Sequence, residues 1–385
     1  MAIVAVALGS SVMFIALATV SGFQNGIKEK VIGIQGHIIV DNLLNTEGSV
    51  PTPLAHKFEK LSNSIFQTSG ILNVSACLIR PCIVRSEGEI DGMLAKGVDR
   101  NYNFDFFKRN LVSGKIPDFD KDTNQAIISE ATSKRLNLKV GDKLQAIFFK
   151  EEIEGPQMAR AIVPVICGIF ATGLEEYDKS LVITYRGLLR KMLPKNESFT
   201  QWEIVLKDYN QAEAIKTSIE QKLPAGVFSV NTVQRYNRQI FDWLGLLDTN
   251  VIIILALMTL ITSITMCTTL LILITERTQM VGVLKALGAA NQSIRSIFIY
   301  QAIFIAATGL ALGNILGLGV CFLQQKYAFI RLPVETYYVN HVLIDIEAWH
   351  VLVVNLGTLA ICFVVLFLPA MIISKLTAVK TMRFQ

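Results

Sequence analysis

Four stretches of the sequence contain no Asp, Glu, Lys or Arg, and each is long enough to cross a membrane as a helix: Met1–Val20, Thr249–Thr275, Ser296–Gln325 and Ala348–Ser374. A spanning helix needs about 20 mostly apolar residues, and charges within it are rare. We therefore expect an integral membrane protein with four transmembrane helices at residues 1–22, 244–275, 296–324 and 348–374. Only 17% of the residues are charged, against about a quarter in soluble domains, which agrees with this expectation.

The first apolar stretch has two interpretations. Ala16-Leu17-Ala18 resembles a signal-peptidase site, which would make this stretch a cleaved signal peptide. A signal peptide starts with a basic segment, however, and this sequence starts inside the apolar run. We expect a retained helix whose cytoplasmic lead-in is absent from the sequence.

Positive charges in the short segments between the spans predict the orientation of the chain in the membrane. Membrane proteins keep loops rich in Lys and Arg in the cytoplasm. Such residues lie in the segment 276–295, between the second and third spans, and in the tail 375–385. Both segments are therefore predicted to be cytoplasmic, which places residues 23–243 and the loop 325–347 on the outer side of the membrane.

The segment 23–243 has the pattern of a mixed α+β domain. The predicted strands are His37–Val40, Leu78–Arg85, Met93–Val98, Ala126–Ser129, Leu144–Phe149, Ile162–Phe170, Ser180–Thr184 and Glu203–Leu206. The predicted helices are Pro53–Leu61, Glu130–Leu136, Arg186–Met192 and Asn210–Lys222. Because helices flank a strand-rich middle, we expect two subdomains, one inserted into the other. We also expect one helix over Thr232–Leu247 that runs directly into the second span.

The sequence lacks the motifs that mark several classes of enzyme, transporter and nucleic-acid-binding protein. It contains no GxxxxGK[ST] phosphate loop, HExxH or GxSxG motif and no Cys/His cluster. The four charge-free stretches offer no acidic or basic residue of the kind that ion-coupled transporters use, and the basic residues form no block for nucleic acid. We therefore expect a chain without catalytic residues, metal or bound cofactor.

A short amphipathic helix is predicted between the second and third spans. Met280, Val281, Leu284 and Leu287 share one helical face, and Gly288 follows as a suitable C-terminal cap. Such a helix either rests on the lipid surface or docks into a groove of a cytoplasmic partner. The residue pattern alone leaves both interpretations open.

The same segment resembles the ERxxEIGxLKALGA signature of FtsX-like permeases, the membrane subunits of one class of ABC transporters. The matching residues are Glu276, Arg277, Gly282, Leu284, Lys285, Ala286, Leu287 and Gly288, whereas Met280 replaces the usual glutamate. In that family the segment is a coupling helix that seats in the ATPase subunit. The resemblance therefore implies a separate ATPase partner, which uses the ATP and Mg.

Other segments resemble the Lol-type lipoprotein-releasing permeases, whose outer domain is MacB-like. They include Gln35-Gly36-His37-Ile38, Lys96-Gly97-Val98-Asp99 and Val379–Phe384. The resemblance implies a bacterial inner-membrane protein that pairs with a second permease chain, identical or homologous, and with a LolD-like ATPase. It would transfer triacylated lipoproteins from the outer leaflet to a LolA-like periplasmic chaperone. A MacB-like efflux permease and an FtsX-like signal relay are the alternatives.

Two further sets of candidate residues follow from that implied function. Acyl chains need an apolar surface, for which we select Phe14, Ile15, Ile253, Leu257 and Leu260, with ordinary helix packing as the alternative. The segment Glu151–Arg160 is either a hairpin tip or a hook that holds the chaperone. The hook residues would be Glu154, Gly155, Pro156, Gln157 and Met158.

Overall fold

The structure of the chain is a computed structural model, and it describes residues 2–45, 51–86, 89–149, 159–194, 197–333, 339 and 341–375. The chain divides into two compact units. Unit 1 comprises Met1–Gly26, Asp242–Leu332 and His341–Gln385, and unit 2 comprises Ile27–Phe241 and Pro333–Asn340. Two helices, α1 (Ala2–Gln35) and α9 (Arg238–Glu276), begin in one unit and end in the other.

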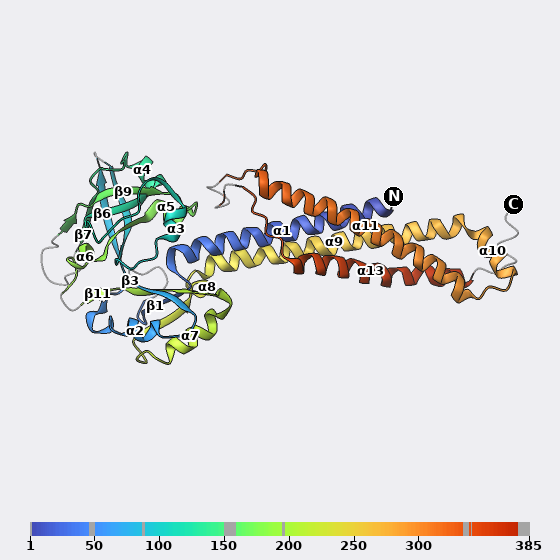
Figure 1. Ribbon diagram of the computed structural model, residues 1–385, viewed down its shortest axis with the longest axis horizontal. Coiled ribbons are helices and arrows are strands. Elements are labelled where there is room, and N and C mark those ends of the chain that lie inside the picture. Colours follow the sequence, from blue (N-terminus) through green and yellow to red (C-terminus); the bar gives the residue numbers. More distant parts are fainter. Residues whose placement is uncertain are drawn as a thin grey trace. The chain divides into compact units, whose positions relative to one another are not determined.

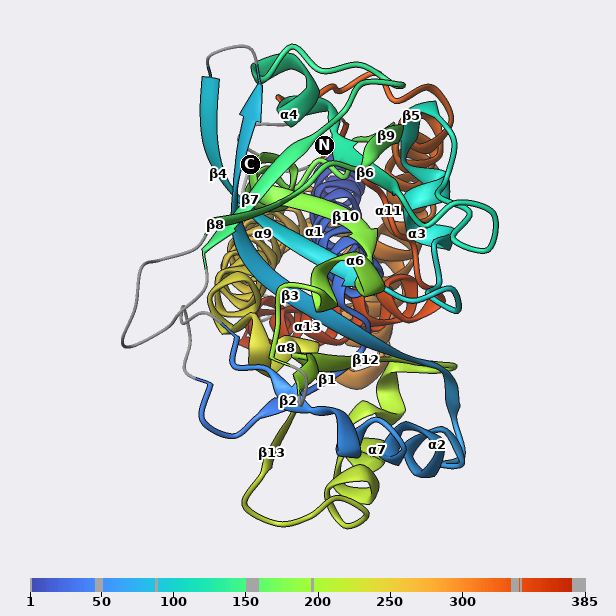
Figure 2. The same ribbon diagram turned by 90° about the vertical axis from the view of Figure 1, so that its left-hand side faces the viewer.

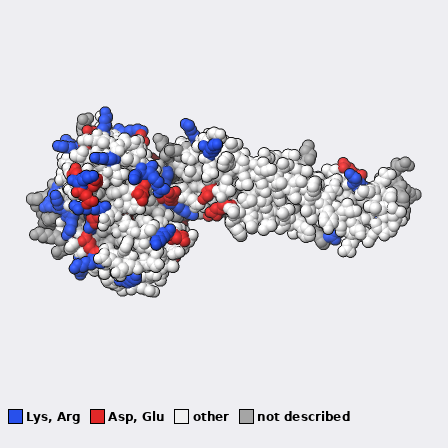
Figure 3. Space-filling model, viewed as in Figure 1, with Lys and Arg blue, Asp and Glu red and all other residues white. Residues whose placement is uncertain are grey.

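Unit 1 is built from long apolar helices. Parts of α1 and α9 lie alongside α11 (Asn291–Tyr327) and α13 (Ala348–Lys375), as Figure 1 shows, and the short α10 (Thr278–Ala286) connects α9 to α11. Among the described residues, α1, α9 and α11 are long and apolar enough to cross a membrane, and α13 is apolar over the shorter range Ala348–Val364. Figure 3 shows a broad band of this unit without charged side chains. Three of the four predicted spans therefore lie on helices that are long and apolar enough to cross a membrane.

The first helix is longer than the first predicted span. That span was placed at residues 1–22, whereas α1 continues to Gln35 and the division between the units falls after Gly26. The extra residues include Lys28, Glu29 and Lys30, which interrupt the apolar run without interrupting the helix. The hydropathy pattern marks where the apolar run stops, and the backbone hydrogen bonds of a helix do not have to stop there.

Unit 2 contains a mixed sheet in the strand order β13–β1–β12–β3–β4–β10–β6–β9–β5, with β7 beside β3, β8 beside β7, and a separate pair of β2 and β11. The strands are β1 (Ile38–Asn42), β2 (Leu54–Ala55), β3 (Ile71–Ser86), β4 (Glu89–Val98), β5 (Leu111–Gly114), β6 (Gln125–Ser129), β7 (Gln145–Phe149), β8 (Ala159–Ile162), β9 (Val165–Phe170), β10 (Leu181–Tyr185), β11 (Glu197–Phe199), β12 (Gln201–Leu206) and β13 (Phe228–Thr232).

Short helices complete unit 2. They are η1 (His56–Phe58), α2 (Leu61–Phe66), α3 (Asp105–Arg109), α4 (Glu130–Arg135), α5 (Glu175–Ser180), α6 (Arg186–Arg190), η2 (Tyr209–Gln211), α7 (Ala212–Glu220) and α8 (Val233–Tyr236). The mixture of strands and helices is the α+β domain that the sequence predicts.

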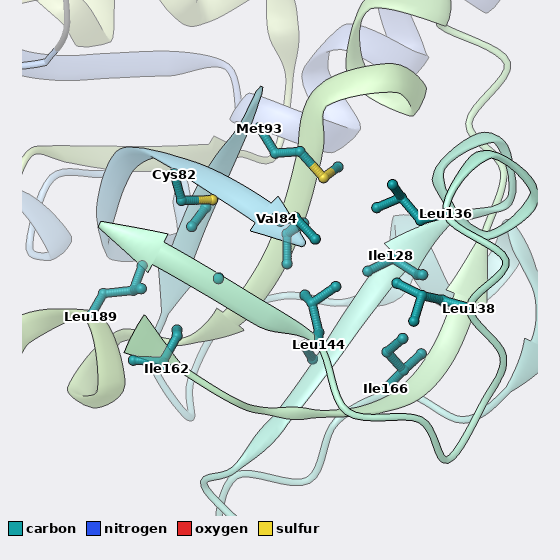
Figure 4. Close-up of a cluster of buried hydrophobic side chains, with 14 of the residues drawn as sticks. Cys82, Val84, Met93, Ile128, Leu136, Leu138, Leu144, Ile162, Ile166 and Leu189 are labelled. Atoms are coloured by element: carbon teal, nitrogen blue, oxygen red, sulfur yellow. The ribbon is translucent and has the colours of Figure 1, made fainter. Parts of the chain in front are cut away.

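The long strand β3 links two separate hydrophobic clusters. Its first part, Ile71–Cys77, pairs with β12, and its second part, Leu78–Ser86, pairs with β4 (Figure 2). The cluster on the second part, which we call the β4 cluster, includes Leu78, Val84, Met93, Ile128, Leu136, Leu144 and Ile166 (Figure 4). The cluster on the first part, which we call the β12 cluster, includes Ile38, Phe199, Trp202, Ile204, Ile215 and Ile219. Burial of these side chains is the main stabilising contribution in unit 2.

Three sequence predictions in unit 2 are wrong in detail. The segment Pro53–Leu61 is not one helix, because Leu54–Ala55 pairs with β11 before a single 3-10 turn. The predicted strand Ile162–Phe170 is two strands, since Pro164 lies between them and has no N–H to donate to a ladder.

The predicted helix Thr232–Leu247 is interrupted, because α8 ends at Tyr236 and α9 begins at Arg238. Residue Asn237 separates α8 from α9 with φ −109° and ψ 49°, outside the helical region. Its side-chain Nδ2 donates to the Val233 carbonyl at 3.0 Å, the kind of local bond by which asparagine competes with a continuous helix.

Candidate functional site

The segment with the permease signature forms a helix with a defined end. α9 stops at Glu276, and only Arg277 separates it from α10. The Thr278 hydroxyl donates back to the Ile274 and Thr275 carbonyls at 3.0 and 2.7 Å. At the other end, the N–H groups of Gly288 and Ala289 bond to the Lys285 and Leu284 carbonyls, which is the Schellman arrangement. Gly288 has φ +90°, so the predicted glycine cap is confirmed.

The helix α10 has one buried and one exposed apolar face. Val281 is fully buried and packs with Ile274, Ile294 and Phe298, with Leu284 partly buried against them. Gly282 is also buried, and Lys285 is half-buried. This contact fixes α10 against the ends of α9 and α11.

The exposed face is formed by Met280, Val283 and Leu287, which are 36%, 53% and 80% exposed. Their spacing of three and four residues places them on one side of the helix. The single face predicted for Met280, Val281, Leu284 and Leu287 is therefore divided between the two sides. Val283 was missed by the sequence reasoning, although its spacing from Met280 is a helical one. Glu276, Arg277 and Ala286 are also exposed.

The candidate acyl-chain residues fall into two groups. Ile253, Leu257 and Leu260 lie on α9 at helical spacing and are all more than half exposed. Phe14, in contrast, is buried in a cluster with Met13 and Val354, and Ile15 is half-buried. In the structure, therefore, α9 offers an open apolar stripe, whereas Phe14 packs inside the helices of unit 1.

The candidate hook lies outside the described residues, because residues 150–158 are not described. The two strands that flank it are described, and β7 and β8 pair antiparallel from Ala146↔Ile162 to Phe149↔Ala159. The ladder brings the two ends of the segment together, as a hairpin requires.

The Gln35-Gly36-His37 segment ends α1 and begins the sheet of unit 2. The Gln35 side-chain oxygen accepts a hydrogen bond from Asn237 Nδ2 at 2.7 Å, and Gly36 has φ +79° with the Ile204 carbonyl close to where a β-carbon would lie. His37 Nδ1 accepts the Leu206 N–H at 3.2 Å. Burial lowers the pKa of His37, so the imidazole is held neutral with Nδ1 as its acceptor.

The Lys96-Gly97-Val98-Asp99 segment supplies contacts to three other parts of unit 2. The Lys96 ammonium lies 2.7 Å from the Glu203 carboxylate of β12 and 2.5 Å from the Ile34 carbonyl of α1. Burial is the largest single effect on Lys96 and lowers its pKa, but the charge and hydrogen bond of Glu203, together with Tyr102 and Cys77, outweigh it, so the pKa is raised. Gly97 leaves room for the backbone of Arg186, where a β-carbon would come within 2.9 Å of its Cα.

The segment ends in a second, partly buried ion-pair group. The Arg186 guanidinium donates through Nε to Asp99 at 2.8 Å, contacts the other Asp99 oxygen through Nη2 at 2.7 Å, and also pairs with Glu59. Neither Glu203 nor Arg186 was selected from the sequence, because their partners lie about a hundred residues away and no local pattern indicates the pairing.

Comparisons with known proteins match both halves of the chain. The family model described as "MacB-like periplasmic core domain" matches residues 1–222, and the model described as "FtsX-like permease C-terminal" matches residues 252–378, which include α10. Both models agree with the division into a domain with a mixed sheet and a set of apolar helices.

Curated relatives match along the whole chain at low identity. A lipoprotein-releasing system transmembrane protein LolC of Neisseria meningitidis serogroup B is 21% identical over all of this chain and 93% of its own length. The corresponding LolE of Haemophilus influenzae is 20% identical over 97% of this chain and 91% of its own length. Among solved structures, the periplasmic region of MacB from Actinobacillus actinomycetemcomitans covers 55% of this chain and 95% of its own, with 12% identity and a TM-score of 0.39.

Proposed function

This chain belongs to the family of FtsX-like ABC transporter permeases with a MacB-like periplasmic core domain, and on that premise we propose that it releases lipoproteins from the bacterial inner membrane. In this proposal it takes a triacylated lipoprotein from the outer leaflet and passes it to a LolA-like periplasmic chaperone. The observation that carries the proposal is the full-length similarity to proteins named as lipoprotein-releasing.

In this proposal the energy comes from a LolD-like ATPase in a separate chain, as membership of the FtsX-like permeases implies. We assign the exposed face of α10, formed by Met280, Val283 and Leu287, as the surface that seats in the ATPase. The opposite face packs through Val281 onto α9 and α11. A helix held in this way on one side suits a helix-in-groove contact on the other.

The exposed α9 stripe of Ile253, Leu257 and Leu260 supports a route for acyl chains. The stripe carries no charge and lies on a helix that is long enough to cross the bilayer. Such a surface would keep the acyl chains out of water as they leave the bilayer, where exposure costs about 0.8 kcal/mol per methylene group. A second permease chain, identical or homologous, would cover the stripe from the opposite side. The burial of Phe14 makes it a packing residue within this chain.

The remaining features of the proposal follow the orientation predicted from charge. α13 is the fourth span, α10 and the C-terminal tail are cytoplasmic, and unit 2 is periplasmic. The β4 and β12 clusters are the cores of two subdomains.

The segment 151–160 is the hook that holds the chaperone, and deleting it is expected to abolish chaperone capture while ATP hydrolysis continues. Unchanged capture would rule the hook out.

Photo-crosslinking tests the acyl route directly. A photoreactive residue replaces Leu257 on α9 or, as the matched control, Leu356 on α13, which is exposed to a similar degree. The probe is a synthetic triacylated lipopeptide in proteoliposomes that contain the permease and its ATPase. We expect labelling from position 257 that exceeds labelling from position 356 and that changes on addition of ATP. Equal labelling from both positions would show that the α9 stripe is not the route for acyl chains.

A further inference from the structure

The side chain of Lys96 is almost completely buried, and all three of its N–H donors have partners. Nζ donates to the Ile34 carbonyl, to Glu203 Oε2 and to the Tyr102 hydroxyl at 2.5, 2.7 and 3.1 Å. Gln201 Nε2 donates to the second Glu203 oxygen at 2.9 Å. Lys96 and Glu203 are 1% and 3% exposed, so solvent does not share these contacts.

The Ile34 carbonyl belongs to the last turn of α1. The last four carbonyl groups of a helix have no partner within the helix, and they carry the negative end of its dipole. A buried ammonium is therefore a favourable partner for this end. The Tyr102 hydroxyl also reaches the same carbonyl, at 3.3 Å. One helix that begins in unit 1 thus ends on a positive charge held inside unit 2.

Through the Lys96 ammonium, the end of α1 is connected to the strands of both the β4 cluster and the β12 cluster. Lys96 lies on β4, opposite Ile79 of β3 and Ile183 of β10. Glu203 lies on β12, opposite Ile39 of β1. A displacement of the end of α1 would therefore pull on the strands of the β4 cluster and of the β12 cluster at the same time.

Stability alone does not explain such a pair. Burying two charges costs about as much as their attraction returns, and apolar residues of similar size often replace a buried ion pair without loss of stability. Apolar residues would not provide a directional hydrogen bond to the Ile34 carbonyl. The contacts therefore point to a role in holding the end of α1 in one orientation relative to the strands.

We propose that Lys96, held by Glu203, is the positioning residue through which movement of α1 is transmitted to the periplasmic sheet. This inference rests on the proposed function, because it assigns a step between ATP hydrolysis and cargo release. It predicts that loss of the Lys96 contact separates these two activities. The ATPase continues to turn over, and less cargo leaves the membrane per ATP.

The test uses the full chain, reconstituted with its ATPase in proteoliposomes that contain a fluorescent triacylated lipopeptide. The variant is Lys96→Met/Glu203→Leu, which removes both charges and keeps the side-chain volume. The matched control is Arg186→Met/Asp99→Leu, which removes Arg186 and Asp99 from the neighbouring ion-pair group and leaves Glu59. Within the described part of the chain, the Arg186 side chain contacts Asp99 and Glu59 and not α1.

We expect lipopeptide released per ATP to fall by about tenfold in the Lys96→Met/Glu203→Leu variant, the order of effect of one charged hydrogen bond, and to stay at the wild-type value in the control. ATP hydrolysis stays within about twofold of wild type in both variants. A wild-type release ratio in the folded Lys96→Met/Glu203→Leu variant would overturn the inference. A control that loses release to the same degree would overturn it as well.

A smaller change keeps the inference testable if the double variant fails to fold. Tyr102→Phe removes one oxygen atom, with its bonds to Lys96 and Ile34, and we expect the release ratio to fall by about twofold. An unchanged ratio would count against the transmission role. Failure of the proposed function looks different, because the wild-type complex itself would then hydrolyse ATP without releasing lipopeptide.

Discussion

The Ser10 side chain of α1 occupies the space that a β-carbon on Gly313 of α11 would fill. The same relationship recurs one turn away on each side, where Gly309 faces Val6 and Gly317 faces the backbone of Ser11. Helices in lipid associate through such close contacts between small residues, because water provides no hydrophobic driving force there. The three glycines therefore determine how closely α1 and α11 approach.

Substitution of Gly313 is expected to destabilise unit 1. Gly313→Leu forces α1 away from α11, at a cost of about 1–3 kcal/mol from overpacking. Thermal unfolding of the detergent-purified protein measures the loss. Gly319→Leu is the matched control, since no atom lies within 4 Å of a β-carbon at that position. Equal destabilisation by both variants would contradict the close packing of α1 and α11.

The exposed face of α10 can be separated from its buried face by mutation. Leu287→Asp places a charge on the exposed stripe, and we expect the ATPase to be lost from co-purification, whereas Leu287→Met retains it. Gly282→Glu and Leu284→Asp are also expected to abolish ATPase binding while membrane insertion remains intact. Because Gly282 is buried and Leu284 partly so, these two changes also disturb packing of α10. Full ATPase recovery with Leu287→Asp would exclude the exposed face as the docking surface.

Single and double substitution of the buried pair Lys96 and Glu203 should change the free energy of unfolding by different amounts. Lys96→Met leaves the Glu203 carboxylate buried without its cation, which costs about 3–5 kcal/mol. Lys96→Met/Glu203→Leu removes both charges, so it should recover most of that loss. Chemical denaturation of the purified chain, followed by tryptophan fluorescence to which Trp202 in the β12 cluster contributes, reports the difference. A double variant no more stable than Lys96→Met would show that the pair itself is required for stability.

His37 predicts a dependence of stability on pH. Burial lowers its folded-state pKa below the ordinary value of 6.5, so the unfolded chain binds a proton more readily than the folded chain. The contribution of neutral His37 is complete above the ordinary value and is lost as the pH falls below it. Melting temperatures between pH 8 and pH 5 should decline over that range in the wild type. His37→Asn keeps an acceptor for the Leu206 N–H without titrating, and its profile should be flatter. If the melting temperatures of the wild type and of His37→Asn declined equally with falling pH, His37 would not be the group responsible.

The local patterns of the sequence predicted the helices of unit 1 and the cap of α10, because apolar runs and a glycine at a helix end act over a few residues. They failed at Pro53–Leu61, where pairing of Leu54 with β11 overrides helical spacing. They also missed the break at Asn237, which depends on a local side-chain bond and on a contact to Gln35, distant in sequence. The partner of Lys96 lies on β12, beyond any local pattern, so the contacts of this site could only come from the structure.

The most direct test of the account is ATP-driven release by the complete system. The full chain is purified with its ATPase, reconstituted in proteoliposomes that contain a fluorescent triacylated lipopeptide, and supplied with a LolA-like chaperone. We predict that lipopeptide appears in the soluble fraction, bound to the chaperone, only when ATP is present, and that Leu287→Asp prevents this. An ATPase that binds the chain and hydrolyses ATP while all the lipopeptide stays in the membrane would contradict the account.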